Sequence, residues 1–145
     1  MNTQHITVDR FKSLAPEKFS FLEHRGFHRE SVAELTSPTA STLVYLGRYV
    51  GFIVSFDVRD QCVDVQVVRV RDGKMHTRID GGYSSDLFVH LVEHEGYRGK
   101  PVQSAQHRGD GGSPDDLQAM LDRWAVLIQD VGGSLLRDQP GSLPG

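Results

Sequence analysis

The sequence contains very little cysteine. Cys62 is the single cysteine among 145 residues, so a disulfide within the chain is excluded. A protein without disulfides is typical of a reducing compartment. A chain of this length buries about two-thirds of its unfolded surface, so it needs no disulfide or metal to stabilise it. We therefore expect one domain held together by its hydrophobic core.

Long apolar runs are also lacking. No window approaches the roughly 18 apolar residues that a membrane-spanning helix requires. Residues 1–9 do not provide the basic start and apolar stretch of about 7–15 residues that a secretory signal needs. The sequence therefore predicts a cytoplasmic protein with no membrane partner.

The chain has no large excess of charge of one sign. Its 16 Lys and Arg and 19 Asp and Glu give a formal net charge of −3. This balance does not supply the broad positive potential that nucleic acid attracts. Basic residues surround the Asp72-Gly73 turn, but aspartates are interleaved with them, which is typical of a solvated sheet edge. We expect no nucleic-acid partner.

The hydrophobic pattern predicts helices at both ends of the chain and strands between them. Apolar residues at helical spacing over 8–22 predict a helix that Pro16 divides in two. A slip in the alternation at Val67-Val68 suggests a bulge. β-Branched and aromatic residues predict a weak edge strand and then four strands, over 27–37, 42–46, 50–58, 62–71 and 75–79.

Two further helices are predicted after the strands. Ser84 or Ser85 is suited to cap a helix that runs to about Glu95. An apolar stripe from Leu117 to Leu135 predicts a second helix, which we expect to continue, though weakened, across Gly132-Gly133. The prediction is an α+β domain over residues 1–137, with a flexible tail over 138–145. Its sheet is a four- or five-stranded antiparallel meander with the N-terminal and C-terminal helices packed on one face.

One motif has the spacing of a metal site. His90 and His94 belong to an H-x-x-E-H segment, the spacing of the inverted zincins, and two histidines four residues apart on a helix can share one metal. On a helical projection, however, both fall with Glu93 on the polar side, opposite the apolar residues. No distant Glu follows His94 to supply a third ligand. We therefore predict a solvated helix face, with no metal, no cofactor and no catalytic residue.

Tyrosines and aspartates are the predicted contacts to a protein partner. Tyrosine is enriched at recognition surfaces, and Tyr45 and Tyr49 are expected to be partly exposed. Tyr83 and Tyr97 flank the predicted third helix, where they could line a groove. Three aspartates in the strand region would supply charges at the rim. The predicted partner-binding residues are Tyr45, Tyr49, Tyr83, Tyr97, Asp57, Asp60 and Asp64.

Several segments together resemble a known group of proteins. They are F-L-x-x-x-G-F at 21–27, the tyrosine-rich segment 43–52, Phe56 to Arg59, and Trp124 to Ile128. This pattern resembles small bacterial proteins of unassigned activity, some of which are similar to the immunity proteins of polymorphic toxins. The resemblance implies a non-enzymatic protein-binding domain, an immunity-type inhibitor that sterically blocks a cognate bacterial toxin. It assigns no catalytic residue.

Two alternatives remain open. The chain could be a small-molecule-binding or enzymatic domain with a pocket between sheet and helices. His76, His90, His94 and Arg98 would then be the polar members of that pocket. It could also be a structural protein that self-associates through the stripe from Leu117 to Leu135. The sequence does not decide between a monomer and a homodimer.

Overall fold

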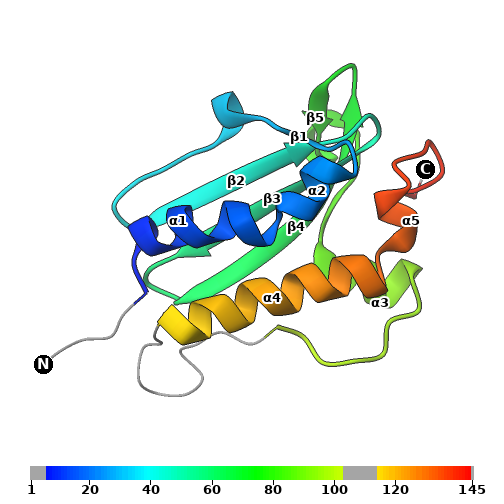
Figure 1. Ribbon diagram of the computed structural model, residues 1–145. Coiled ribbons are helices and arrows are strands. Elements are labelled where there is room, and N and C mark those ends of the chain that lie inside the picture. Colours follow the sequence, from blue (N-terminus) through cyan, green and yellow to red (C-terminus); the bar gives the residue numbers. More distant parts are fainter. Residues whose placement is uncertain (1–5, 103–113, 145) are drawn as a thin grey trace, which may run out of the picture.

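The computed structural model describes residues 6–102 and 114–144 (Figure 1). Within these ranges, none of the helices combines the length and the apolar composition needed to cross a bilayer. The helices are α1 (Val8–Lys18), α2 (Ser20–His24), α3 (Leu87–His94), α4 (Pro114–Asp130) and α5 (Gly133–Leu136). The strands are β1 (His28–Arg29), β2 (Ala40–Leu46), β3 (Val50–Asp57), β4 (Cys62–Arg71), β5 (Lys74–His76) and β6 (Ser84–Asp86). Two short 3₁₀ turns, η1 (Ser31–Ala33) and η2 (Arg78–Asp80), complete these elements.

The sheet is antiparallel, as predicted, and its order is β1-β2-β3-β4-β5. Strand β6 also pairs with β4, over the residues directly before those that pair with β5. This strand includes Ser84 and Ser85, so the prediction that either caps a helix is wrong. The carboxylate of Asp86 caps α3 instead, because it accepts a hydrogen bond from the Val89 N–H at 3.3 Å. The α+β class is confirmed.

Strands β3 and β4 pair without interruption. Their register runs from Val50 opposite Arg69 to Asp57 opposite Cys62, so the predicted bulge at Val67-Val68 is wrong for this pairing. The alternation slips because both faces of the sheet are apolar at this end. Val67 belongs to the main core, whereas Val68 lies on the other face. There it packs beside Gly51, where an added Cβ would come within 3.1 Å of a Val68 methyl group.

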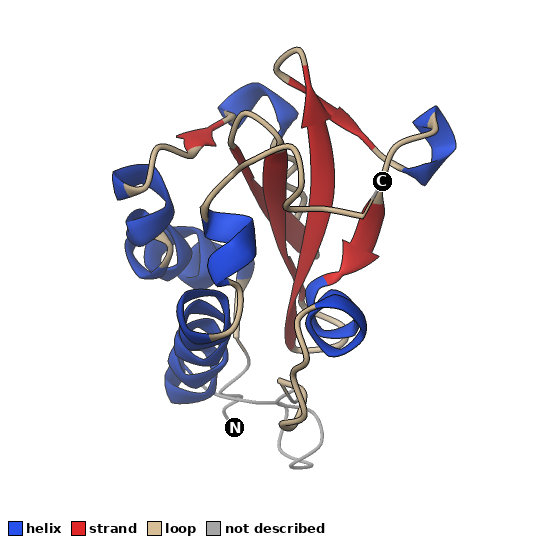
Figure 2. Cartoon of the chain, turned by 90° about the vertical axis from the view of Figure 1, so that its right-hand side faces the viewer, coloured by secondary structure: helices blue, strands red, loops and turns tan. Residues whose placement is uncertain are grey.

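The main core lies between one face of the sheet and the helices. Figure 2 shows most of the helices on the same side of the strands, as predicted. Alternate residues of β3, namely Phe52, Val54 and Phe56, point into this core. Trp124 joins α4 to β4, because its indole Nε1 donates to the Val63 carbonyl at 2.7 Å. A smaller cluster on the opposite face contains Val44, Leu46 and Val70, packed against Ala33, Ile53 and Met75.

The N-terminal helix breaks later than predicted. Helix α1 continues through Pro16 to Lys18, and the break comes at Phe19. Proline has a helical φ but removes one backbone hydrogen bond, and α1 continues beyond it only to Lys18. The Phe19 ring is fully buried in the core. Tertiary packing therefore places the break, and the prediction that Pro16 divides the helix is wrong.

The C-terminal helix does not continue across Gly132-Gly133. It ends at Asp130, and α5 is a separate turn of helix. At Gly132 an added Cβ would lie 2.8 Å from the Ile128 carbonyl oxygen, so the chain passes too close for a side chain. Leu135 is still buried, which extends the apolar stripe in space although not along one helix.

Residues 138–144, predicted as a flexible tail, contact the domain in the structure. The Asp138 carboxylate accepts three backbone N–H groups, from Arg48 at 2.6 Å, Tyr49 at 2.7 Å and Val50 at 2.9 Å. Leu143 is buried. Because hydrogen bonds to a carboxylate are stronger than those between neutral groups, Asp138 fixes this segment to the β2–β3 hairpin.

Candidate functional site

Tyr45, one of the predicted contacts, is not on the surface. It is fully buried, and its ring lies 6.4 Å from that of Phe19 between centroids. Its hydroxyl has no hydrogen-bond partner among the residues that the structure describes. Burial raises the pKa of this phenol to about 12. Tyr45 therefore cannot contact a partner, and the prediction that it is partly exposed is wrong.

The other three tyrosines are half-buried and lie in different parts of the molecule. Tyr49 is at the β2–β3 turn, below the Arg48 guanidinium at 5.7 Å from the ring centroid. Tyr83 packs against α3. The Tyr97 hydroxyl accepts a hydrogen bond from Arg123 Nη2 at 2.7 Å. Tyr83 contacts His90 and His94 of α3, whereas Tyr97 contacts Phe88 of the same helix as well as Arg123 of α4.

The predicted aspartates, in contrast, do come together. Asp64 and Asp57 lie on the same side of the sheet, because β3 and β4 pair Asp57 with Cys62, two residues from Asp64. Asp86 joins them, since it pairs with Gln66 of β4. We call the surface formed by Asp57, Asp60, Asp64 and Asp86 the acidic face. Sequence reasoning missed Asp86 because the segment was interpreted as the start of a helix.

The acidic face lies on the side of the sheet away from α1 and α4. The side chains of Asp64, Asp86 and Gln66 are exposed there. Partial burial and then the negative charges of Asp86, Asp60 and Asp57 raise the pKa of the Asp64 carboxyl. Arg78 borders this surface, where its Nε donates to the Ser84 carbonyl at 2.9 Å. The acidic face is thus a negatively charged surface whose residues are held in place by the strands of the sheet.

His90 is buried, although the sequence predicts a solvated position. Helix α3 buries Leu87, His90 and Leu91, whereas Val89 is 41% exposed and Val92 is 43% exposed. The buried side of the helix is therefore rotated relative to the predicted apolar side. Because α3 has only eight residues, its packing against β4 and β6 decides which side faces inward.

A polar network surrounds the His90 ring. Its Nδ1 lies 2.8 Å from the Tyr83 hydroxyl. Its Nε2 lies 3.4 Å from Glu95 Oε2, a contact that would be an ion pair only if the ring were protonated, and it has no hydrogen-bond partner among the described residues. The Ser134 hydroxyl donates to the same Glu95 oxygen at 2.6 Å. Burial lowers the pKa of His90, although Glu95 opposes this.

A cavity of about 340 Å³ is lined by three members of this network, His90, Glu95 and Ser134, together with His94 and residues 141–144. The His90 and His94 rings are 5.1 Å apart between centroids. Across 6–102 and 114–144, however, no group of three or more His, Cys, Asp or Glu is arranged to hold a metal ion. Of the other predicted pocket residues, His76 lies in β5 opposite Arg69, and Arg98 lines a different cavity beside Tyr97.

The lowered pKa of His90 predicts a loss of stability in acid. Unfolded histidine takes up a proton near its ordinary pKa of 6.5, whereas the buried ring remains neutral to lower pH. The unfolded state therefore binds more protons below that pKa, so the free energy of unfolding decreases as the pH is lowered. Between about pH 7.5 and 5.5 the wild type should lose up to about 1.4 kcal/mol more than His90→Gln in urea unfolding. Equal losses in the two proteins would contradict a buried neutral His90.

No family model, curated protein or solved structure matches the chain. The two candidate sites of the chain are the acidic face and the His90 cavity.

Proposed function

We propose that the protein is a non-enzymatic binding domain whose acidic face contacts a basic surface of another protein. The gathering of four carboxylates on one side of the sheet supports this proposal. Like charges on neighbouring strands are destabilising. Their repulsion would be relieved by a partner that brings positive charge, and such complementarity gives speed and specificity to association.

An immunity-type inhibitor is the specific form of this function that we propose. The resemblance of the F-L-x-x-x-G-F segment at 21–27 and the segment 43–52 to such proteins supports it. A sheet held by a packed core offers a rigid surface, so binding orders few side chains. A typical interface covers about 800 Å² on each partner. The inhibitor would block the toxin sterically, without any covalent step.

The product of a neighbouring toxin-like reading frame is the partner with which to test this function. Isothermal titration calorimetry should give a dissociation constant in the nanomolar range. The affinity should fall as salt is raised, because salt screens exposed charges beyond about 10 Å at 0.1 M. An absence of association at micromolar concentrations would overturn the proposal. Association that salt does not weaken would contradict the role of the acidic face.

The His90 cavity supports a second candidate function, binding of a small molecule. A buried ring nitrogen without a hydrogen-bond partner among the described residues faces Glu95 beside this cavity. Buried polar atoms of this kind are rare and call for a partner. A set of small polar amines and carboxylic acids can be screened while the His90 ring signals are followed by NMR. Signals that stay unchanged with every compound would contradict this candidate.

A further inference from the structure

A second charged region lies at the other end of β4. Arg69 and Arg71 are two residues apart on this strand, so both point to the same side of the sheet. Strand β5 pairs His76 with Arg69 and Lys74 with Arg71. The cations of Arg71 and Lys74 thus lie directly opposite one another on the two strands. Like charges in this position destabilise a hairpin, and an anion bound beside Arg71 would reduce that cost.

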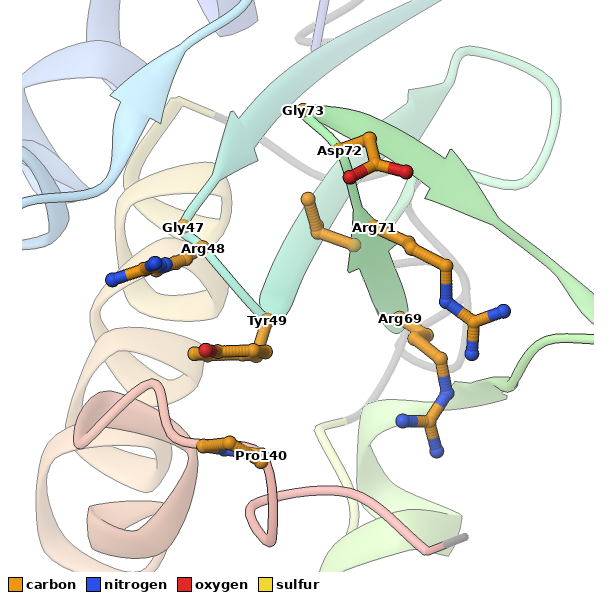
Figure 3. A pocket seen from close by; sticks show the side chains of 9 residues that line it. Gly47, Arg48, Tyr49, Arg69, Arg71, Asp72, Gly73 and Pro140 are labelled. Carbon is orange, nitrogen blue, oxygen red and sulfur yellow. The ribbon is translucent and has the colours of Figure 1, made fainter.

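These arginines line a cavity beside the turns that end β2 and β4. Its volume is about 630 Å³, and its lining residues include the three arginines Arg48, Arg69 and Arg71, against one acidic residue, Asp72. Figure 3 shows the guanidinium groups of Arg69 and Arg71 close together, with Arg48 on the other side of the cavity. The cavity therefore has an excess of positive charge.

The positive charge is not neutralised within the described part of the chain. There, Arg48, Arg71 and Lys74 form no ion pair with a carboxylate. Arg69 Nη2 donates to the Pro144 carbonyl oxygen. That contact orients the guanidinium group but does not cancel its charge, since a carbonyl is neutral.

The wall opposite Arg69 and Arg71 is held in place before any ligand arrives. The Asp138 carboxylate binds the backbone N–H groups of Arg48, Tyr49 and Val50. At Gly47 an added Cβ would lie 2.5 Å from an Asp138 carboxylate oxygen, so this approach requires glycine. A wall fixed in this way reduces the ordering that a ligand must impose.

We propose that this cavity binds a phosphate group carried by a small molecule, between Arg69 and Arg71. A guanidinium group presents parallel N–H donors that match two phosphate oxygens. A phosphate monoester carries close to two negative charges at neutral pH, which suits an excess of cations better than the single charge of a carboxylate. The volume is within the usual range for small-molecule sites. The site faces the opposite side of the sheet from Asp64, so it is independent of the acidic face.

The proposal is tested by titrating the full chain with inorganic phosphate, glycerol 3-phosphate, AMP and succinate, with calorimetry as the readout. We expect a phosphate compound to bind with a dissociation constant below the millimolar range and succinate to bind more weakly. Arg71→Gln and the double variant Arg69→Gln/Arg71→Gln should weaken binding about tenfold or more. Arg71→Gln leaves the contact between Arg69 and Pro144 intact, so it separates loss of ligand binding from a disturbed C-terminal segment.

A matched control removes the same charge elsewhere. Arg10→Gln/Arg25→Gln changes two exposed arginines, one in α1 and one directly after α2, and should bind as the wild type does. Tighter binding of a monoester than of inorganic phosphate would show that the ligand is a small molecule, and equal binding would show that the site takes the free ion. No binding at millimolar phosphate, equal binding of succinate, or wild-type affinity in Arg71→Gln and in the double variant would each overturn the proposal.

Discussion

Replacing Trp124 by alanine should lower the free energy of unfolding by about 3–5 kcal/mol. The Trp124 side chain is 2% exposed, and it is the largest side chain that α4 contributes to the core. Its removal leaves a cavity between α4 and β4 and also removes the hydrogen bond from Nε1 to the Val63 carbonyl. Urea unfolding followed by circular dichroism would measure the change.

Two further variants separate packing from hydrogen bonding at this position. Trp124→Phe keeps an aromatic ring but leaves the Val63 carbonyl without its donor, and we expect a loss of about 1–3 kcal/mol. Val126→Ala, on the same helix at a side chain that is 42% exposed, should cost about 0.5 kcal/mol or less. A Trp124→Ala variant no less stable than Val126→Ala would contradict the packing of α4 on the sheet.

Neutralising the acidic face should weaken binding of the protein partner by about 100-fold. The variant is Asp57→Asn/Asp64→Asn/Asp86→Asn, with affinity measured by calorimetry. Asparagine preserves the local structure. Asp57 accepts backbone N–H groups from Arg59 and Asp60, Asp86 caps α3, and asparagine can accept the same bonds. The loss would therefore report the missing charge.

The control for this experiment changes net charge by the same amount on the helical side. Glu17→Gln/Glu23→Gln/Asp130→Asn alters three exposed carboxylates of α1, α2 and α4. It should leave the affinity within about threefold of the wild type, since screening limits the reach of exposed charges. An equal loss in both triple variants would show that net charge, and not the acidic face, controls association.

The sequence predicted the three long strands β2, β3 and β4 well, because alternation reports directly on a half-buried strand, but the edge strand predicted over 27–37 is only the two-residue β1, and β6 was not predicted. Strand β4 has the predicted bounds. Alternation could not assign Tyr45, however. Its neighbours Val44 and Leu46 are apolar as well, and they fill the small cluster on the other face while Tyr45 enters the main core. Where both faces are apolar, the pattern alone does not say which residue is exposed.

Predictions that depended on short helices or on distant contacts were weaker. The burial of His90 depends on which side of the eight-residue helix α3 packs inward, and the packing of α3 against the neighbouring strands determines that side. The contact between Asp138 and Arg48 joins residues 90 positions apart, and no local sequence pattern predicts it.

Mapping the surface that a partner occupies is the most direct test of the claim that the acidic face binds a protein. Amide chemical shifts of the labelled protein can be followed by NMR as the neighbouring toxin-like product is added. We predict the largest changes at Ser55, Asp64, Gln66 and Asp86, on the strands that carry the acidic face. Changes concentrated in α1 and α4, with the acidic face unaffected, would contradict the account.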